Sequence, residues 1–270
     1  MIDSRTHVYG VFGNPVRHSQ SPLIHNACFQ QHHVNAVYLA FEIKEISKAV
    51  AAMRTLDIKG ASITIPFKEG IMECLDEIDP DAMDIGAVNT VVNKDGTLIG
   101  YNTDYTAAIA PLTPFGIKNK TVCVMGAGGA AQAVAYGIHK AGGALVIINR
   151  DKDRGRRLAV KYRADFISME KINKMNALPA DILINTTSIG MRPDVNRSPV
   201  PSNLLTSQMI VMDIVYTPLK TKLLSQAEEK GASTIDGLSM FVHQGAAQFN
   251  LWTGISPDIQ QMRNVIIKGV

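Results

Sequence analysis

The sequence predicts an α/β protein of two domains, with C-terminal helices that return to the first domain. Three observations predict this class. Short apolar strands alternate with helical segments along most of the 270 residues. A glycine-rich turn at 126–131 restarts the alternation near the middle of the chain. After the last predicted strand comes an apolar helical stretch, Leu238 to Trp252, and then a further helix that begins at Ser256–Pro257 with proline in its first turn.

The first predicted domain spans residues 1–110, with 239–270 packed back on it. Its strands and helices are predicted, in order, at Val8–Phe12, Pro22–His32, Ala36–Phe41, Lys44–Leu56 and Gly60–Ile65. This β-α-β-α-β order implies a parallel or mixed sheet with helices on its faces.

The glycine-rich turn follows an apolar strand and precedes an alanine-rich helix. Gly126 permits a tight turn, Gly128 lets backbone N–H groups approach a pyrophosphate, and the small Ala131 lets the helix pack closely on the strand. The helix N-terminus adds positive potential for phosphate groups. The strands of this region, including the one before the turn, are predicted to begin at Val122, Ala144, Ile182, Met209 and Ser233. Residues 111–238 are therefore predicted to form a Rossmann-like, dinucleotide-binding domain.

The strand after this turn ends where a dinucleotide-binding fold reads the ribose. An NAD site would place Asp or Glu there, but this strand ends in Asn149–Arg150, with Lys152 and Arg154 close behind. Guanidinium groups match a 2′-phosphate in charge and in geometry. The pattern favours NADP over NAD. The alternative is a solvated basic loop, and Asp151 and Asp153 dilute its positive charge.

Composition and charge narrow the class of protein. A net charge of +3 is too small to indicate nucleic acid or a membrane surface as a partner. No apolar run reaches the roughly 20 residues of a membrane span, and the N-terminus lacks the layout of a signal peptide. The cysteines Cys28, Cys74 and Cys123 are scattered, and no His/Cys cluster has metal-ligand spacing. We therefore expect a cytoplasmic protein that binds a small molecule and needs no metal.

Two serines precede the first predicted helix, in the segment His18–Ser19–Gln20–Ser21–Pro22. Hydroxyls two residues apart, with N–H groups nearby, suit a small anion. Capping of the helix by Ser21 is a simpler explanation of the same residues and, taken alone, the favoured one.

The segment Ser62–Glu69 carries Thr64 and then Lys68 past the end of a strand, where clefts form in α/β proteins. Lys68 is predicted at the start of a helix, an unfavourable place for a cation. The lysine therefore either has a catalytic purpose or extends into water.

A hairpin is predicted around Asp95–Gly96, a dipeptide that favours a tight turn. This turn sets Asn89 opposite Asn102 and gathers both with Asp104 at the open end of the hairpin. Amide, hydroxyl and carboxylate groups collected there suit a polyhydroxylated substrate. An edge hairpin with polar ends explains the clustering less well.

Nine segments, in this order, resemble the shikimate dehydrogenase family, and the match that they form extends along nearly the whole chain. They are Gly13–Pro22, Thr64–Glu69, Gly86–Thr90, Gly100–Asp104, Gly126–Ala130, Asn149–Arg150, Asn185–Met191, Asp213–Tyr216, and Asp236–Leu238 with Gln244. The resemblance implies reversible, NADPH-dependent reduction of 3-dehydroshikimate to shikimate, on the route to chorismate and the aromatic amino acids. The resemblance leaves open whether the protein forms a homodimer.

The resemblance also implies a role for each matching residue. Lys68 and Asp104 would form the catalytic pair, because hydride arriving at a ketone carbon leaves an alkoxide that needs a proton or a nearby positive charge. The substrate carboxylate would be held by Ser19, Ser21 and Tyr216, and the ring hydroxyls by Thr64, Asn89, Asp104 and Gln244, with Lys68 also in contact. The cofactor would contact Gly126, Ala127, Gly128, Gly129, Ala130, Asn149, Arg150, Asp151, Lys152, Asp153, Arg154, Ile214 and Gly237.

Three alternatives remain open from the sequence. Much of the family has Thr or Ser where this chain has Asp151, whose carboxylate would repel a 2′-phosphate; this favours a quinate/shikimate dehydrogenase that accepts NAD or NADP. Both serines of the Ser19–Ser21 pair fit the shikimate-specific branch better. A non-catalytic NADP-sensing protein would lack Lys68 or Asp104, which are both present. A methylenetetrahydrofolate dehydrogenase would share the architecture alone.

Overall fold

The computed structural model describes residues 2–269, and the chain divides into two compact units. Unit 1 consists of Met1–Thr103 and Val242–Val270, and unit 2 of Asp104–Phe241. The predicted domains, 1–110 with 239–270 and 111–238, also assign a ligand to each part. That assignment remains a prediction, because compactness does not test what a unit binds.

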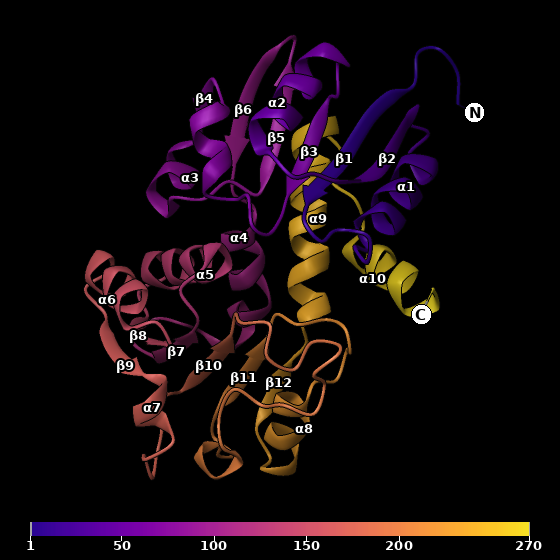
Figure 1. Ribbon diagram of the computed structural model, residues 1–270. Coiled ribbons are helices and arrows are strands. Elements are labelled where there is room, and N and C mark those ends of the chain that lie inside the picture. The colour runs from indigo at the N-terminus through magenta and orange to yellow at the C-terminus, as the bar shows by residue number, and fades with distance from the viewer. Residues whose placement is uncertain (1, 270) are drawn as a thin grey trace. The chain divides into compact units, whose positions relative to one another are not determined.

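Unit 1 contains a six-stranded mixed sheet in the order β2-β1-β3-β5-β6-β4 (Figure 1). The crossovers through helices make β1 parallel to β2 and β3, whereas a tight turn makes β5 and β6 antiparallel. That turn is Asp95–Gly96, and both residues have the positive φ that such a hairpin needs. The strands are β1 (His7–Gly13), β2 (Ala36–Glu42), β3 (Gly60–Ile63), β4 (Glu77–Ile78), β5 (Thr90–Lys94) and β6 (Thr97–Tyr101).

The helices of unit 1 are α1 (Ser21–Gln31), α2 (Ile46–Thr55), α3 (Pro80–Ile85), the 3₁₀ helix η1 (Gly70–Cys74), α10 (Ile259–Lys268) and the later part of α9 (Gly237–Thr253). α1 packs on β2 and on α10. The predicted start of the last helix at Ser256–Pro257 is wrong. The helix begins at Ile259 because the Asp258 side chain accepts hydrogen bonds from the backbone N–H groups of Gln260 and Gln261, which caps it.

Unit 2 contains a six-stranded parallel sheet in the order β12-β11-β10-β7-β8-β9. Its strands are β7 (Thr121–Met125), β8 (Ala144–Asn149), β9 (Asp165–Ser168), β10 (Ile182–Asn185), β11 (Ile210–Asp213) and β12 (Ser233–Ile235). The chain runs outward from β7 to β9 and then returns to β10 on the other side of β7. The strand order therefore reverses between β7 and β10, and ligands bind at such a reversal in Rossmann-like sheets.

Helices cover this sheet on the connections between strands, as a parallel sheet requires (Figure 1). α5 lies along β7 and β8, α6 along β8 and β9, and α8 along β11 and β12. The helices of unit 2 are α4 (Asp104–Ile109), η2 (Ala110–Phe115), α5 (Gly129–Lys140), α6 (Lys152–Lys161), α7 (Met169–Ile172), η3 (Ser202–Leu204), α8 (Lys222–Glu229) and the first turn of α9. The predicted α/β class, with a mixed sheet and a Rossmann-like sheet, is confirmed.

An aromatic cluster fills the core of unit 1 beneath α1 and α9. The fully buried ring of His25 stacks on Tyr38, with ring centroids 4.5 Å apart, and lies 5.1 Å from the ring of Trp252. Burial lowers the pKa of His25 from 6.5 to about 3, although the nearby amide of Gln248 acts in the opposite direction. The imidazole is therefore neutral in the folded protein at ordinary pH.

This histidine makes unit 1 sensitive to acid. Between pH 6.5 and about 3 the unfolded chain binds a proton at His25 that the folded chain does not. The free energy of unfolding should therefore fall with decreasing pH by up to about 1.4 kcal/mol per unit from this group. Urea unfolding at pH 7, 6 and 5, followed by the fluorescence of Trp252, the single tryptophan, measures the slope. His25→Phe should flatten it and the exposed His7→Gln should not; equal slopes in the two variants would contradict the assignment.

Candidate functional site

In unit 1, the segments that follow β1 and β3 meet at one edge of the sheet. The Thr64 backbone N–H donates to the Phe12 carbonyl at 3.0 Å, and the Asn14 N–H donates to the Ile65 carbonyl at 3.0 Å. A Cβ at position 13 would collide with the Thr64 methyl group, so only glycine allows this approach. The loop that carries the serines is thereby joined to the loop that carries Thr64.

The two serines lie at the start of α1. Ser21 is buried, Ser19 is half-buried, and the Ser21 N–H donates to the Ser19 hydroxyl oxygen at 3.3 Å. The expectation that Ser21 caps the helix is wrong. Gln20 occupies the N-cap position and makes no side-chain capping bond, while Ser21 is already the first helical residue. The capping explanation therefore does not apply, and the binding of an anion by the two serines stays a prediction.

Lys68 lies in a turn and not at the start of an α-helix, so that expectation is wrong. The chain after it forms only η1, a five-residue 3₁₀ helix. The Lys68 carbonyl accepts a hydrogen bond from the Val88 N–H at 2.8 Å, and the Asn89 carbonyl accepts one from the Ile63 N–H at 2.7 Å. These two bonds bring the half-buried Lys68 and the end of β3 to the residues that precede β5.

Asn89 is buried at the open end of the hairpin. Because Thr90 pairs with Tyr101, Asn89 and Asn102 follow as the next opposed residues, as predicted. The Asn89 Oδ1 accepts from the Thr103 N–H at 2.8 Å, and the Asn89 Nδ2 donates to the Thr103 hydroxyl at 2.9 Å. A backbone N–H only donates, so the orientation of the Asn89 amide is fixed. The Asn102 Nδ2 instead donates to the Ala87 carbonyl at 2.8 Å and so holds the loop between α3 and β5.

Helix α9 brings Gln244 to the same part of unit 1, where its carbonyl accepts a hydrogen bond from the Thr103 hydroxyl at 3.3 Å. One turn later, Gln248 is 1% exposed and bonded to the Asn89 carbonyl. Sequence reasoning missed Gln248. The signal that could have found it is the Gln244/Gln248 spacing, which places two amides on one face of the helix.

In unit 2, four parallel strands end together at the point where the strand order reverses. Met125 lies beside both Ile148 and Asn185, and Asn185 lies beside Asp213. The loop after β7 begins with Gly126, whose φ of +116° is accessible to glycine; a Cβ there would also contact the Thr186 hydroxyl. The predicted turn is therefore present at the expected edge.

The glycine turn leaves room for phosphate groups. Gly128 is exposed, is the N-cap of the twelve-residue helix α5, and has no heavy atom within 4 Å of where a Cβ would stand. Backbone N–H groups of a first helical turn need acceptors, and a pyrophosphate supplies them. The turn thus provides space, donors and positive potential, and the residues present fit a dinucleotide.

The carboxylate of Asp151 orders the basic turn that follows β8. The Asp151 carboxylate accepts from the N–H groups of Asp153 and Arg154, both at 3.0 Å, and so caps α6. These backbone bonds lower the pKa of Asp151, so the group is held as an anion turned toward the helix. Arg150 is exposed and forms no ion pair with any residue of 2–269, whereas Lys152 pairs with Glu170 at 2.9 Å. Arg150 thus remains the cation best suited to a 2′-phosphate.

A buried carboxylate supports the loop after β11. Asp213 accepts hydrogen bonds from the Asn185 amide (2.9 Å), the Val215 N–H (3.0 Å) and the Thr221 hydroxyl (2.7 Å). Burial raises the pKa of Asp213 to about 6, against the opposing effect of these three donors. The side chain fixes the course of the chain through Ile214, the first predicted cofactor contact beyond this strand.

Gly237 and Tyr216 belong to the same part of unit 2. A Cβ at Gly237 would lie 2.5 Å from the carbonyl oxygens of Ile214 and Val215, so the start of α9 packs directly on this backbone. The Tyr216 ring stacks on Phe241 with centroids 4.6 Å apart. The loop after β11 and the first turn of α9 therefore form one packed surface.

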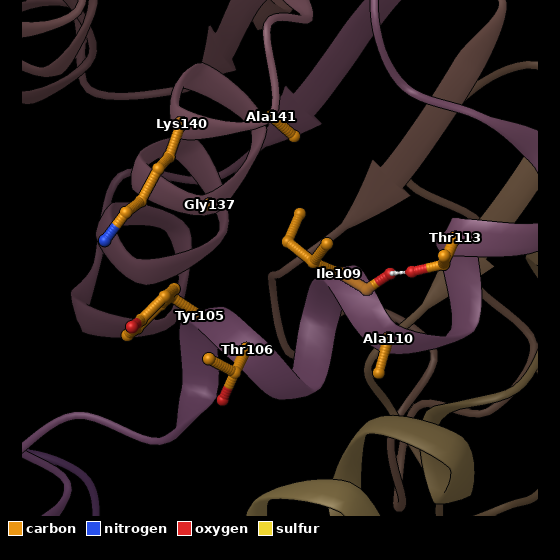
Figure 2. A pocket seen from close by; sticks show the side chains of 8 residues that line it. All are labelled: Tyr105, Thr106, Ile109, Ala110, Thr113, Gly137, Lys140 and Ala141. Atoms are coloured by element: carbon orange, nitrogen blue, oxygen red, sulfur yellow. Dashed lines mark hydrogen bonds between the residues drawn. The ribbon is translucent and has the colours of Figure 1, made fainter.

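A separate hollow of about 380 Å³ lies within unit 2, between α4, η2 and α5 (Figure 2). Its lining includes the small residues Ala110, Gly137 and Ala141, with Tyr105 and Lys140 at one side (Figure 2). None of the predicted site residues lines it. The hollow therefore plays no part in the assignment of the site.

Residues 2–269 contain neither a candidate metal-binding cluster nor a candidate membrane-spanning helix. No group of three or more His, Cys, Asp and Glu side chains in that range could hold a metal ion. No helix there is both long enough and apolar enough to cross a membrane.

Comparison with family models accounts for most of the chain. The model of the shikimate dehydrogenase substrate binding domain matches residues 11–91, and that of shikimate / quinate 5-dehydrogenase matches residues 110–239. The model of the shikimate 5′-dehydrogenase C-terminal domain matches residues 237–267.

Individual proteins are similar over their full lengths. The shikimate dehydrogenase (NADP(+)) of Pyrococcus furiosus is 44% identical over 274 residues, which cover 99% of this chain and 97% of that protein. A crystal structure of a shikimate dehydrogenase in complex with NADP+ has a TM-score of 0.94 at 40% identity, over 100% of this chain and 98% of that one. The Thermus thermophilus enzyme, crystallised with NADP(H) and shikimate, has a TM-score of 0.90 at 33% identity, over 98% of this chain and 100% of that one.

Proposed function

This chain belongs to the shikimate dehydrogenase family, and from that premise we propose how its own residues carry out the reaction. Its activity is the NADP-dependent interconversion of 3-dehydroshikimate and shikimate, an oxidoreduction at a CH–OH group. In the family this step serves the synthesis of chorismate and the aromatic amino acids. The proposals below concern the roles of individual side chains.

We propose that Lys68 is the proton donor for reduction and that Asp104 is its partner. When bound, NADPH supplies the hydride that reaches the ketone carbon. The Lys68 ammonium gives its proton to the oxygen on which negative charge develops, and in the reverse direction neutral Lys68 accepts the proton of the hydroxyl. The support is the fixed turn that carries Lys68, the place of Lys68 within the matched substrate binding domain, and the resemblance of the segments Thr64–Glu69 and Gly100–Asp104 to those of the family.

The substrate contacts are proposed on the same basis. Ser19 and Ser21, with Tyr216, would hold the carboxylate, because hydroxyl donors at the start of α1 suit an anion. Thr64, Asn89, Asp104 and Gln244 would hold the ring hydroxyls. The fixed amide of Asn89 is the observation that carries this assignment, since a preset donor and acceptor distinguish one hydroxyl arrangement from another.

The cofactor contacts follow the same edge of unit 2. The glycine turn 126–130 would bind the pyrophosphate, and the turn 149–154, Arg150 above all, would bind the 2′-phosphate. Ile214 and Gly237 would contact the nicotinamide side. Supporting observations are the open space at Gly128 and the exposed guanidinium of Arg150.

We also propose that the protein works in the cytoplasm. Its three cysteines, Cys28, Cys74 and Cys123, are all free thiols, and thiols persist in a reducing compartment.

Replacing Asp104 with Asn should impair both substrate binding and turnover. The buried carboxylate would lose its charge, and with it the partner of the lysine and an acceptor for a ring hydroxyl. We expect kcat/KM for shikimate to fall by about 10- to 100-fold, with KM raised and kcat lowered. The exposed Asp84→Asn serves as the control. A near wild-type Asp104→Asn enzyme would show that the hairpin end has been misassigned.

Initial rates test the function and its specificity together. Purified protein is assayed for oxidation of shikimate and of quinate, each with NADP and with NAD. We expect activity with shikimate and NADP to exceed the other three combinations. Comparable rates with quinate or NAD would place the protein in the dual-specificity branch, and no turnover in any combination would refute the catalytic assignment.

A further inference from the structure

A buried glutamine lies behind the proposed substrate residues of unit 1. Gln248, on α9, is 1% exposed, and its amide is fully engaged. The Nε2 group donates to the Asn89 carbonyl at 3.2 Å and to the Thr90 hydroxyl at 3.0 Å, while Oε1 accepts from the Ser62 hydroxyl at 2.7 Å. One side chain therefore connects β3 and β5 from inside the core.

The Asn89 carbonyl fixes the direction of every proton in this group. A carbonyl only accepts, so Gln248 must turn Nε2 toward it and Oε1 toward Ser62. Ser62 has a single proton and must give it to Gln248. The Tyr38 hydroxyl, 2.6 Å from the Ser62 oxygen, must then donate to Ser62. If the Gln248 amide were turned the other way, its Oε1 would face the Asn89 carbonyl oxygen, and two buried acceptors would lie against each other.

One end of this network reaches the amide proposed to bind the substrate ring. The Thr90 hydroxyl accepts from Gln248 and donates to the Asn89 Oδ1 at 2.7 Å. Gln248 therefore restrains Asn89 in two ways. It bonds the backbone carbonyl of Asn89 directly, and it restrains the side chain of Asn89 through Thr90. Loss of the glutamine would release both constraints at once.

The other end of the network fixes the glutamine itself. Tyr38 lies on β2, and its hydroxyl donates to the Ser62 hydroxyl, which in turn donates to the Gln248 Oε1. Both side chains are buried, so these two hydrogen bonds hold the Gln248 amide in the orientation that serves Asn89.

We propose that Gln248 is a positioning residue for the substrate: it holds Asn89, and Ser62 and Tyr38 in turn hold the Gln248 amide in the required orientation. The proposal rests on the proposed function, because Asn89 is a substrate residue only there. Its consequence is that the amide proposed to bind the ring hydroxyls is held in place by a hydrogen-bond network in the core.

The test compares Gln248→Met with Tyr38→Phe. Methionine keeps the length and fills the space but removes the hydrogen bonds that Gln248 makes to Ser62, Thr90 and the Asn89 carbonyl, so KM for shikimate should rise about tenfold or more. Tyr38→Phe keeps the stacking on His25 and removes only the hydroxyl, so KM for shikimate should rise less. In both variants KM for NADP should stay within about twofold of wild type, because the network touches no proposed cofactor residue.

The KM for shikimate of the double variant distinguishes a positioning role of Gln248 from a merely structural one. Residues of one network are not independent, so Gln248→Met combined with Tyr38→Phe should raise KM for shikimate by less than the product of the single effects. The exposed Gln261→Met should have no effect alone and combine with Gln248→Met multiplicatively. Thermal unfolding followed by Trp252 fluorescence checks that each variant is folded.

The outcomes separate the two proposals. If the wild-type protein failed to oxidise shikimate, the proposed function would fall and this inference with it. If the wild type is active but both variants leave KM for shikimate unchanged, or raise the KM values for shikimate and NADP alike, Gln248 does not position the substrate. Should Gln248→Met fail to fold, Tyr38→Phe alone still decides, because unchanged KM for shikimate in that variant contradicts the coupling of Tyr38, through Ser62 and Gln248, to Asn89.

Discussion

Lys68→Ala is expected to lower kcat for shikimate oxidation by a factor on the order of 10² or more. The reason is that the variant has no group at this position to accept the hydroxyl proton as hydride leaves the carbon. KM for shikimate should change little, because the proton transfer stabilises the transition state and not the bound substrate, and the remaining substrate contacts stay in place. Steady-state rates over a range of shikimate concentrations, at saturating NADP, separate the two parameters.

Two comparisons sharpen this result. Lys44→Ala removes an exposed lysine elsewhere in unit 1 and should leave both parameters unchanged. A small primary amine added to the assay should restore part of the activity of Lys68→Ala and none to Lys44→Ala, since it replaces the missing base. A Lys68→Ala enzyme with normal kcat and a raised KM would refute the catalytic role and leave Lys68 as a binding residue.

Arg150→Ala is expected to weaken NADPH binding by about 10- to 100-fold while NADH binding changes little. The guanidinium is exposed, lies at the end of β8 and is not used by an ion pair within residues 2–269. A 2′-phosphate is present in NADPH and absent from NADH, so the loss should be confined to the phosphorylated cofactor. Fluorescence titration of the purified protein with each cofactor gives both dissociation constants without turnover.

The control is an arginine of the adjoining helix. Arg156→Ala removes a guanidinium of α6 that lies over the Phe166 ring, 5.7 Å from its centroid, and should weaken neither cofactor appreciably. Equal losses for NADPH and NADH in Arg150→Ala would show that the arginine supports the fold of the turn and does not read the phosphate.

The role of Asp151 shows where sequence reasoning stops. From the sequence, this carboxylate is an added negative charge near a proposed phosphate site. In the structure it caps α6 by accepting two backbone hydrogen bonds, and so it orders the very turn that carries Arg150. The same residue pattern fits both accounts, because a capping geometry depends on backbone angles that one-dimensional spacing does not specify.

Features that depend on a few neighbouring residues were predicted correctly from the sequence. Gly126 was predicted at a tight turn and has a positive φ, and Asp95–Gly96 was predicted to set the hairpin register and does. Both depend on backbone angles that particular residues favour. The predictions for Ser21 and Lys68 failed at the boundaries of helices, because short-range preference there competes with tertiary contacts such as that between the Lys68 carbonyl and Val88.

By itself, the sequence determined the α/β class, the glycine turn, the hairpin and the order of motifs that identifies the family, since each is written in neighbouring residues. Only the tertiary structure decided the order of strands in each sheet and the network around Gln248. That glutamine bonds Ser62 across 186 positions and Asn89 across 159. A buried hydrogen bond between residues so far apart is selected by how the whole unit packs, and no local pattern records it.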